Sequence, residues 1–229
     1  MIRLGLIIST FALVLTIMFS VYGWINTPEG ASIPVHFNLS GEADRYGSKA
    51  EAFLFLPALL VGITFLLSIA PAIDPRGKNL RRSRPIYIVG WIIGVVALAG
   101  AQGFLTWTAI GGGVEGETMA RGVGVFISGI LLLVGLVIAR ARPNFFAGIR
   151  TPWTLTSDLS WDKTHRWASR VFTLLGLVGL VSALLLSPEP VTISLIAALL
   201  ASTLGLIVYS FFVWKNDPAR ETLNPDDAD

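Results

Sequence analysis

Six apolar segments run along this chain, and almost every formal charge lies between them. A hydrocarbon core about 30 Å thick needs roughly 20 mostly apolar residues for each helical crossing. All six segments are long enough once the fifth is extended backwards into its polar flank. The pattern therefore predicts an all-α polytopic membrane protein. The expected spans are Leu4 to Ile25, Phe53 to Ile73, Ile86 to Ile110, Gly122 to Ala139, Val171 to Leu186 and Val191 to Trp214.

Composition supports this prediction, because only 14% of the 229 residues are charged, whereas a soluble domain has about 25%. Little besides loops remains outside the spans, so a single membrane domain is expected. The first apolar run is too long for a signal-peptide core and has no small-residue cleavage pattern, which predicts a retained first span. The chain has no Cys, which excludes disulfides and cysteine metal sites.

Charge in the loops predicts the orientation, since Lys and Arg concentrate in cytoplasmic loops. The second and fourth loops are rich in Lys and Arg, whereas the third and fifth carry mainly Glu. Both termini are therefore expected in the cytoplasm, and the first loop, 26–51, outside it. Three spans then fall in each half, 1–110 and 111–214, and residues 215–229 read as an acidic, disordered tail.

The spans themselves carry no ionisable residue well inside the membrane. Ion-coupled carriers usually place such a group there, so a proton-coupled pump is disfavoured and a facilitator stays open. Small residues recur at helical spacing, as at Gly90 and Gly94 or Gly124 and Ser128, and mark packing faces within the chain or in a homodimer. The basic cluster of the second loop is interpreted as a topology determinant resting on anionic lipid.

The first loop predicts a small ordered unit. Ile33, Val35 and Phe37 alternate with polar or small residues, which indicates an extended stretch before a turn at residues 38–41. Ser48 followed by Glu51 fits a capping box at the start of the second span. His36 lies near acidic residues in sequence, so a metal site is conceivable, but a surface histidine is the simpler interpretation.

The fourth loop, residues 140–170, combines aromatic residues with hydrogen-bonding groups. Thr151 before a proline should be extended, which predicts an ordered, irregular stretch from Gly148 to Thr154. Ser157 or Asp158 can start the helix that leads into the fifth span. One interpretation is an aromatic and basic belt at the membrane interface. The other is a directed binding surface.

At this point the residues resemble a known family. PNFFAGIRTPWTLTSDLSWDKTHRWASRVF, residues 143–172, is similar to the signature of the SdpI-type bacterial membrane immunity proteins, and IPVHFNLSGEADRYGSK, residues 33–49, resembles a domain of unknown function found at the N-terminal end of many members. The fourth loop is hereafter the signature loop. The resemblance implies binding residues in both loops. They are Asn144, Gly148, Arg150, Thr151, Pro152, Trp153, Thr154, Trp161, Thr164, His165 and Arg166, and Pro34, His36, Asn38, Gly41, Tyr46 and Lys49.

The resemblance also implies a function. Members are multi-pass proteins of the bacterial cytoplasmic membrane that protect a producer from its own secreted peptide toxin, and one signals by holding a transcriptional repressor at the membrane. We therefore expect a lipid-embedded protein with a peptide toxin and a repressor as partners, no direct nucleic-acid contact, no cofactor and no metal. A membrane hydrolase is the alternative. It is disfavoured because common catalytic motifs are absent and His36 and His165 fall on opposite faces of the predicted topology.

Overall fold

The computed structural model describes residues 1–113 and 116–220. Within them, six helices are long and apolar enough to cross a membrane, which confirms the polytopic helical class. Each contains or closely matches one predicted span, and α7 shows the predicted backward extension of the fifth. These helices are α1 (Ile2–Asn26), α2 (Lys49–Ile73), α4 (Arg84–Ala109), α5 (Gly116–Ile138), α7 (Asp158–Leu185) and α8 (Pro188–Lys215).

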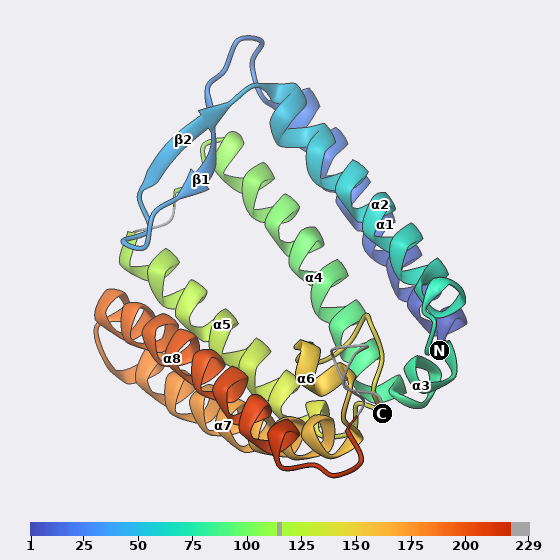
Figure 1. Cartoon of the computed structure of the whole chain (residues 1–229). Helices are drawn as coiled ribbons and strands as arrows, with labels where there is room; N and C mark the ends of the chain where they lie inside the picture. The colour runs from blue at the N-terminus through green and yellow to red at the C-terminus, as the bar shows by residue number, and fades with distance from the viewer. Residues whose placement is uncertain (114–115, 221–229) are drawn as a thin grey trace.

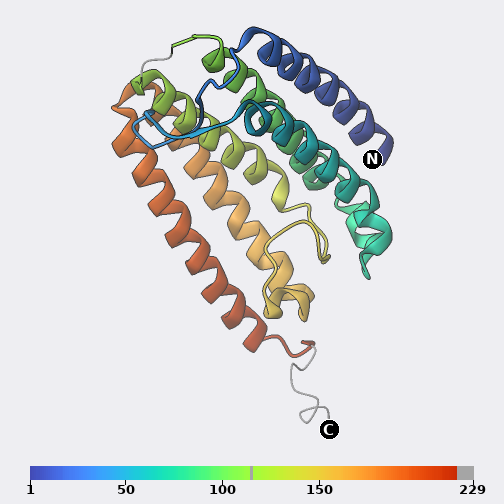
Figure 2. The same cartoon turned by 90° about the horizontal axis from the view of Figure 1, so that it is seen from above.

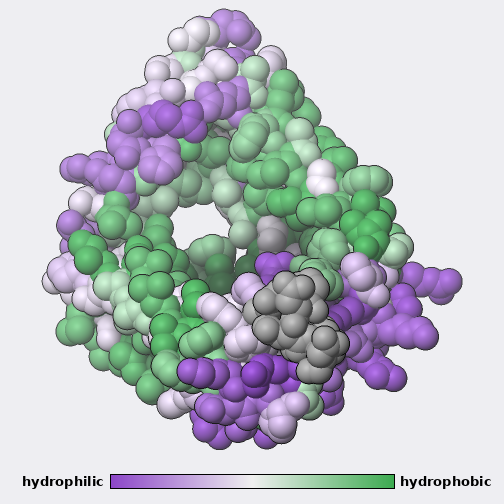
Figure 3. Space-filling model, viewed as in Figure 1, coloured by the Kyte–Doolittle hydropathy of each residue, from purple (hydrophilic) through white to green (hydrophobic). Residues whose placement is uncertain are grey.

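The six helices form two groups of three, α1 with α2 and α4, and α5 with α7 and α8 (Figures 1 and 2). Trp91 and Leu60 lie in the buried cluster of the first group, and Leu131 and Phe172 in that of the second. The space-filling view shows hydrophobic residues over the middle of the molecule and polar residues toward its ends (Figure 3). It also shows an opening between the groups, bordered largely by hydrophobic residues. Contacts at the two ends therefore matter for holding the halves together.

Helix α1 buries its small and polar residues and turns its large apolar residues outward. Its buried positions are Gly5, Ser9, Ala12, Thr16, Ser20 and Gly23. A Cβ on Gly5 would lie 2.6 Å from the ring of Trp91, so only glycine allows this close approach. Ile7 and Phe11 point away from the protein. This arrangement suits a helix surrounded by lipid, where close backbone packing replaces hydrophobic burial.

The first loop adds a short antiparallel hairpin to the helical bundle, formed by β1 (Ile33–Phe37) and β2 (Ala43–Gly47). The predicted turn at residues 38–41 is confirmed, with the Gly41 N–H donating to Asn38 O at 3.0 Å and Gly41 at φ 81°. Ile33 is buried against α2 residues. The alternating pattern thus forms a true strand pair, since the chain folds back with a partner of equal length.

The start of α2 corrects the prediction of a capping box formed by Ser48 and Glu51. Ser48 caps the helix as expected, accepting the Glu51 N–H at 3.3 Å. The Glu51 carboxylate, however, pairs with Arg45 of β2 and not with the Ser48 backbone. The capping box is therefore only half present, because a nearby guanidinium binds a carboxylate more strongly than a peptide N–H does.

The hairpin tip reaches the second half of the molecule. A Cβ on Gly41 would lie 2.1 Å from the carbonyl oxygen of Gly116, at the start of α5. On its other side the hairpin contacts α4, with the rings of Phe37 and Phe104 5.2 Å apart. The hairpin therefore bridges the two helix groups at one end of the bundle, which we call the hairpin end.

The opposite end, the signature-loop end, holds the start of α1, the end of α8 and two short helices, α3 (Gly77–Arg82) and α6 (Pro152–Leu155) (Figure 1). The prediction of an irregular stretch from Gly148 to Thr154 is therefore wrong at its end, where Thr151 caps one helical turn. The tail was also expected to begin at residue 215, but Asp217 is buried against the signature loop. Residues 221–229 lie outside the described residues.

Candidate binding face

Asn144 organises the first turn of the signature loop. Its side chain is fully buried. The Oδ1 atom accepts the N–H groups of Phe146 and Ala147 at 2.8 and 2.7 Å. The Nδ2 atom donates to the carbonyls of Arg142 and Ala147 at 2.7 and 3.0 Å. All four hydrogen-bonding positions of the amide are filled, so Asn144 holds the loop backbone and has no free group for a ligand.

His165 fixes the next part of the signature loop, at Ile149. Its Nε2 accepts the backbone N–H of Ile149 at 2.9 Å, and its Nδ1 lies 2.7 Å from Trp161 O. Because an N–H can donate only to a bare nitrogen, the proton must sit on Nδ1, and the imidazole is neutral. The ring is buried and stacks on Trp161 with 4.1 Å between centroids. His165 therefore positions Ile149.

Gly148 makes this contact possible. Its φ of 125° lies in the left-handed region that favours glycine. A Cβ there would lie 2.4 Å from His165 Nε2 and 3.1 Å from the Trp161 ring. Any other residue would push the loop off the histidine. Trp161 is itself fixed by donation from Nε1 to Ala141 O at 2.9 Å.

Thr151 and Thr154 form a reciprocal capping box around α6. Each side chain accepts the other residue's N–H, at 3.1 and 2.9 Å. Thr154 Oγ1 also donates to Ile149 O at 2.9 Å, and Thr151 Oγ1 lies 3.2 Å from Ser210 Oγ on α8. The two threonines thus connect the loop to the C-terminal helix, and Pro152 suits the first position of α6, which needs no N–H donor.

The second loop supports the signature loop through contacts that the sequence did not predict. Asp74 is buried, and its carboxylate accepts the N–H of Phe145 at 3.1 Å. Asn79 of α3 donates to Pro143 O at 3.0 Å. The Ser83 hydroxyl accepts the Arg142 N–H at 2.8 Å. These contacts span 59 to 71 residues of sequence, and they join the two helix groups at the signature-loop end.

Asp217 fixes the start of α7 from beyond the end of α8. Ser157, the N-cap of α7, donates its hydroxyl to Asp217 Oδ2 at 2.6 Å. This hydrogen bond, together with one from the Ala219 N–H, holds the pKa of Asp217 below its usual range. A carboxylate here also lies near the positive N-terminus of α7, where negative charge is favourable.

Three signature residues keep surface outside this framework. The Arg150 guanidinium is exposed and donates one hydrogen bond, from Nη1 to Phe145 O at 2.5 Å. Trp153 is half-buried against Phe211, with 5.3 Å between ring centroids. Arg166 is exposed and pairs with Asp162 one turn earlier. The remaining position, Thr164, is buried. The exposed part of Arg150 and Trp153 is hereafter the binding face.

A cavity of about 420 Å³ lies between the second loop and the signature loop. Its lining combines two Arg residues, two Asp residues and Trp161. The lining residues are Asn79, Arg82, Ala141, Arg142, Pro143, Asp158, Trp161 and Asp162. Its mixed charge suits a polar segment of a partner better than an apolar ligand.

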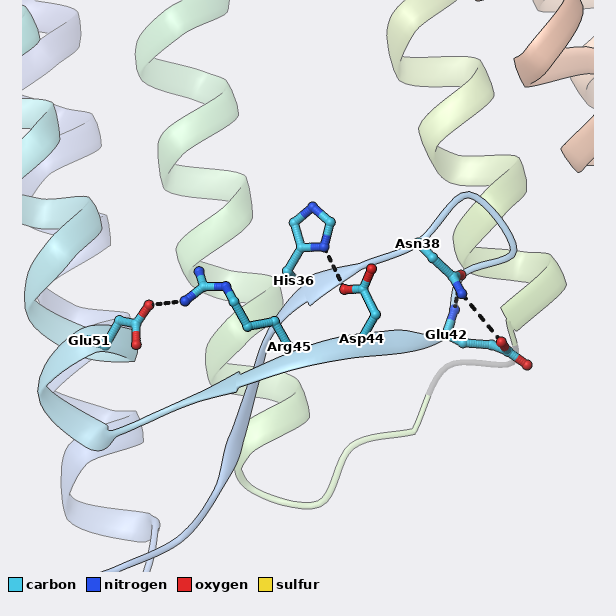
Figure 4. A network of polar contacts seen from close by, with 6 residues as sticks. All are labelled: His36, Asn38, Glu42, Asp44, Arg45 and Glu51. Carbon is cyan, nitrogen blue, oxygen red and sulfur yellow. Dashed lines mark hydrogen bonds and ion pairs between the residues drawn. The ribbon is translucent and has the colours of Figure 1, made fainter.

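Five of the six first-loop signature residues lie on the hairpin and its turn, and Lys49 begins α2. Figure 4 shows two of the five, His36 and Asn38. His36 Nδ1 is 2.5 Å from Asp44 Oδ1, on an exposed surface. Asn38 accepts the Glu42 N–H at 2.9 Å and so closes the turn next to Gly41. Among the described residues, no group of three His, Cys, Asp or Glu side chains is placed to hold a metal ion.

Lys49 is the buried charged residue of this set, with 9% of its side chain exposed. Its ammonium donates to Glu29 at 2.8 Å and lies 5.2 Å from the centroid of the Trp24 ring. It therefore ties the end of α1 to the start of α2. Pro34 is paired in register with Tyr46, whose ring is exposed.

The two sets of signature residues lie at opposite ends of the bundle. Helix α2 separates them, running 25 residues from next to the hairpin to Asp74, or about 37 Å at 1.5 Å per residue. His36 and His165 therefore belong to separate sites, as the sequence predicted.

Two family matches to known proteins cover the two ends separately. Residues 140–210 match the SdpI/YfhL protein family, and residues 11–61 match a domain of unknown function, DUF1648. The chain carries an SdpI-family region. The immunity protein SdpI of Bacillus subtilis (strain 168) is 28% identical over 99 residues, which is 43% of this chain and 46% of that protein. The alignment thus spans about half of the relative's length. No solved structure shows a significant match.

The SdpI-family region coincides with a physical unit. It begins at the signature loop, includes α7, and ends at Ser210, which contacts Thr151 through its hydroxyl and accepts the Ser160 hydroxyl through its carbonyl. Most signature residues therefore build one loop onto two helices of a multi-pass membrane protein. The framework from the second loop lies outside the match, which is why no signature residue pointed to it.

Proposed function

We propose that this chain is a non-enzymatic immunity protein of the bacterial cytoplasmic membrane that gives resistance to a secreted peptide toxin. The SdpI-family match and the six membrane-spanning helices support the proposal. The observation that carries it is the construction of the signature loop. Seven signature residues fix the loop through side-chain hydrogen bonds or backbone geometry, and this framework leaves Arg150 and Trp153 at its surface.

The binding face has the chemistry of a protein-recognition surface. A guanidinium can form two parallel hydrogen bonds with a carboxylate, and within the described residues Arg150 uses one donor, toward Phe145 O. Tryptophan and arginine dominate the energetics of many interfaces. We assign this face to a cytoplasmic partner that protection requires, a transcriptional repressor held at the membrane, with the hairpin facing the side from which a secreted peptide arrives.

The orientation follows from charge. The signature-loop end carries the basic second loop and the basic signature loop, and the hairpin end carries Glu117 and Glu189 at the starts of α5 and α8. Because positive loops stay in the cytoplasm, the binding face and both termini are cytoplasmic in this proposal.

A survival assay tests the function. A Bacillus subtilis strain lacking its own immunity protein SdpI would express this chain and be exposed to the peptide toxin of its parent strain. We expect survival well above that of the empty-vector strain at equal toxin dose. Killing equal to the vector control, with the chain present in the membrane, would contradict immunity toward that toxin.

A further inference from the structure

Two cavities meet between α1 and α2. The first, of about 420 Å³, lies at the signature-loop end and is lined by Met1, Ile2, Ser68, Pro71, Ala72, Arg81 and Arg84. The second, of about 270 Å³, is lined by Leu6, Ser9, Thr10, Leu13, Val61, Thr64, Phe65 and Ser68. Ser68 borders both, so the two cavities adjoin. We take them together as one groove, cationic at its outer end and mostly apolar further in.

The cationic end has uncompensated charge. Arg81 and Arg84 are exposed, and within residues 1–113 and 116–220 neither forms an ion pair with a carboxylate. Arg81 Nη1 lies 3.4 Å from Pro71 O, which holds the guanidinium over the end of α2. Two guanidinium groups beside one cavity are suited to a phosphate, which accepts bidentate hydrogen bonds.

The whole groove is about as long as one membrane leaflet is deep. Along α1 the lining runs from Ile2 through Leu6 to Leu13, and along α2 from Ala72 back to Val61. Eleven residues of helix rise about 17 Å at 1.5 Å per residue, and one leaflet of a 30 Å hydrocarbon core is about 15 Å deep. The groove thus begins at headgroup level and ends near the midplane of the membrane.

We propose that this groove binds an anionic phospholipid from the leaflet at the signature-loop end, with its phosphate on Arg81 and Arg84 and one acyl chain between α1 and α2. The site goes beyond the immunity function and does not depend on it. It also changes the interpretation of the second loop, because two of its basic residues become parts of a defined site. α3 carries both Arg81 and Asn79, so the lipid would lie next to the contact that supports the signature loop.

Native mass spectrometry of the purified full chain, released from detergent micelles with added lipid, tests the proposal. We expect phosphatidylglycerol to bind at least about tenfold more tightly than phosphatidylcholine, since only the anionic lipid keeps a net charge for the two guanidinium groups. Inorganic phosphate and glycerol phosphate should bind much more weakly than the lipid, because they leave the apolar groove empty. Measurements on the wild-type chain alone can overturn the proposal. They would do so if both lipids bound equally, or if glycerol phosphate bound as tightly as phosphatidylglycerol.

Matched variants separate a site from diffuse attraction. The double variant Arg81→Gln, Arg84→Gln should weaken phosphatidylglycerol binding about tenfold. The control Arg76→Gln, Lys78→Gln removes the same charge from the same loop but leaves the groove lining intact, so it should bind phosphatidylglycerol like wild type. Ser68→Phe fills the junction of the two cavities with every charge retained, and it should also weaken binding about tenfold. If both charge pairs weaken binding equally, or if Ser68→Phe binds like wild type, the lipid is not in the groove.

Discussion

The backbone N–H of Ile149 donates to Nε2 of His165 across 2.9 Å, and this contact sets the state of the histidine. With Nδ1 used toward Trp161 O, the neutral ring has no free nitrogen for a metal or for proton transfer. The most chemically suggestive residue of the signature loop is therefore part of its framework. What the loop can offer to a partner lies in the side chains that this framework leaves exposed.

Replacing His165 by Ala should destabilise the protein, because the Ile149 N–H would lose its buried acceptor. An unsatisfied buried group costs about 1–3 kcal/mol. We expect a clearly lower thermal unfolding midpoint in detergent, with unfolding monitored by tryptophan fluorescence. Arg166→Ala, which removes only an exposed ion pair worth about 0–1 kcal/mol, is the matched control. Equal midpoints for His165→Ala and wild type would refute the role of this contact.

Gly148→Ala should be more damaging than its size suggests. The new methyl group would need to occupy space 2.4 Å from His165 Nε2, at a φ that disfavours any side chain. Gly62→Ala in α2 serves as the comparison, since no atom lies within 4 Å of the added Cβ there and alanine favours a helix by about 1 kcal/mol over glycine. The account predicts a lower midpoint for the first variant and an unchanged or higher one for the second. The reverse order would contradict it.

The pair of Asp217 and Ser157 predicts a specific dependence on pH. Because the folded-state pKa of Asp217 is depressed, its contribution to stability is present above the unfolded pKa of about 4 and is lost as the pH falls through the folded value. The midpoint difference between wild type and Asp217→Asn should be constant from pH 8 to about 5 and shrink below about 4. A difference that does not change with pH would show that the carboxylate charge is not involved.

The topology can be tested on a clean background, because the chain has no Cys. Leu39→Cys places a thiol on the exposed hairpin turn, and Lys163→Cys places one on the exposed face of α7 near its start. In intact cells, a membrane-impermeant maleimide should label the first and not the second, and both should react after lysis. Labelling of both in intact cells would invalidate the proposed orientation.

The sequence was sufficient to predict the helices and several of their ends. Each crossing requires an apolar run of fixed length, so the spans were visible without any structure. Ser48 and Ser157 were recognisable as caps because an N-cap acts on backbone groups only three residues away. The resemblance singled out the residues of the signature loop as one group, but it did not separate those that hold the loop from those at its surface. Their role in binding stays a prediction.

The supporting contacts could not be predicted, because they join residues far apart in sequence. Asp74 and Asn79 looked like ordinary loop residues, and their bonds to Phe145 and Pro143 leave no local pattern. Asp217 appeared to belong to a solvated acidic tail until the fold placed it beside Ser157. The buried small-residue face of α1 could not be predicted either, because its burial at Gly5 depends on contact with Trp91 in α4.

The most direct measurement is survival under peptide toxin of cells that express wild type, Arg150→Lys, Trp153→Ala or the control Lys163→Gln, at equal amounts in the membrane. Lys can replace the single hydrogen bond to Phe145 O but not the bidentate fork, and Ala removes the half-buried indole. The account predicts protection by wild type and Lys163→Gln and its loss in the two binding-face variants. Full protection by Arg150→Lys and Trp153→Ala, with protection lost instead when exposed hairpin residues such as Tyr46 are replaced, would contradict it and place the functional surface at the hairpin end.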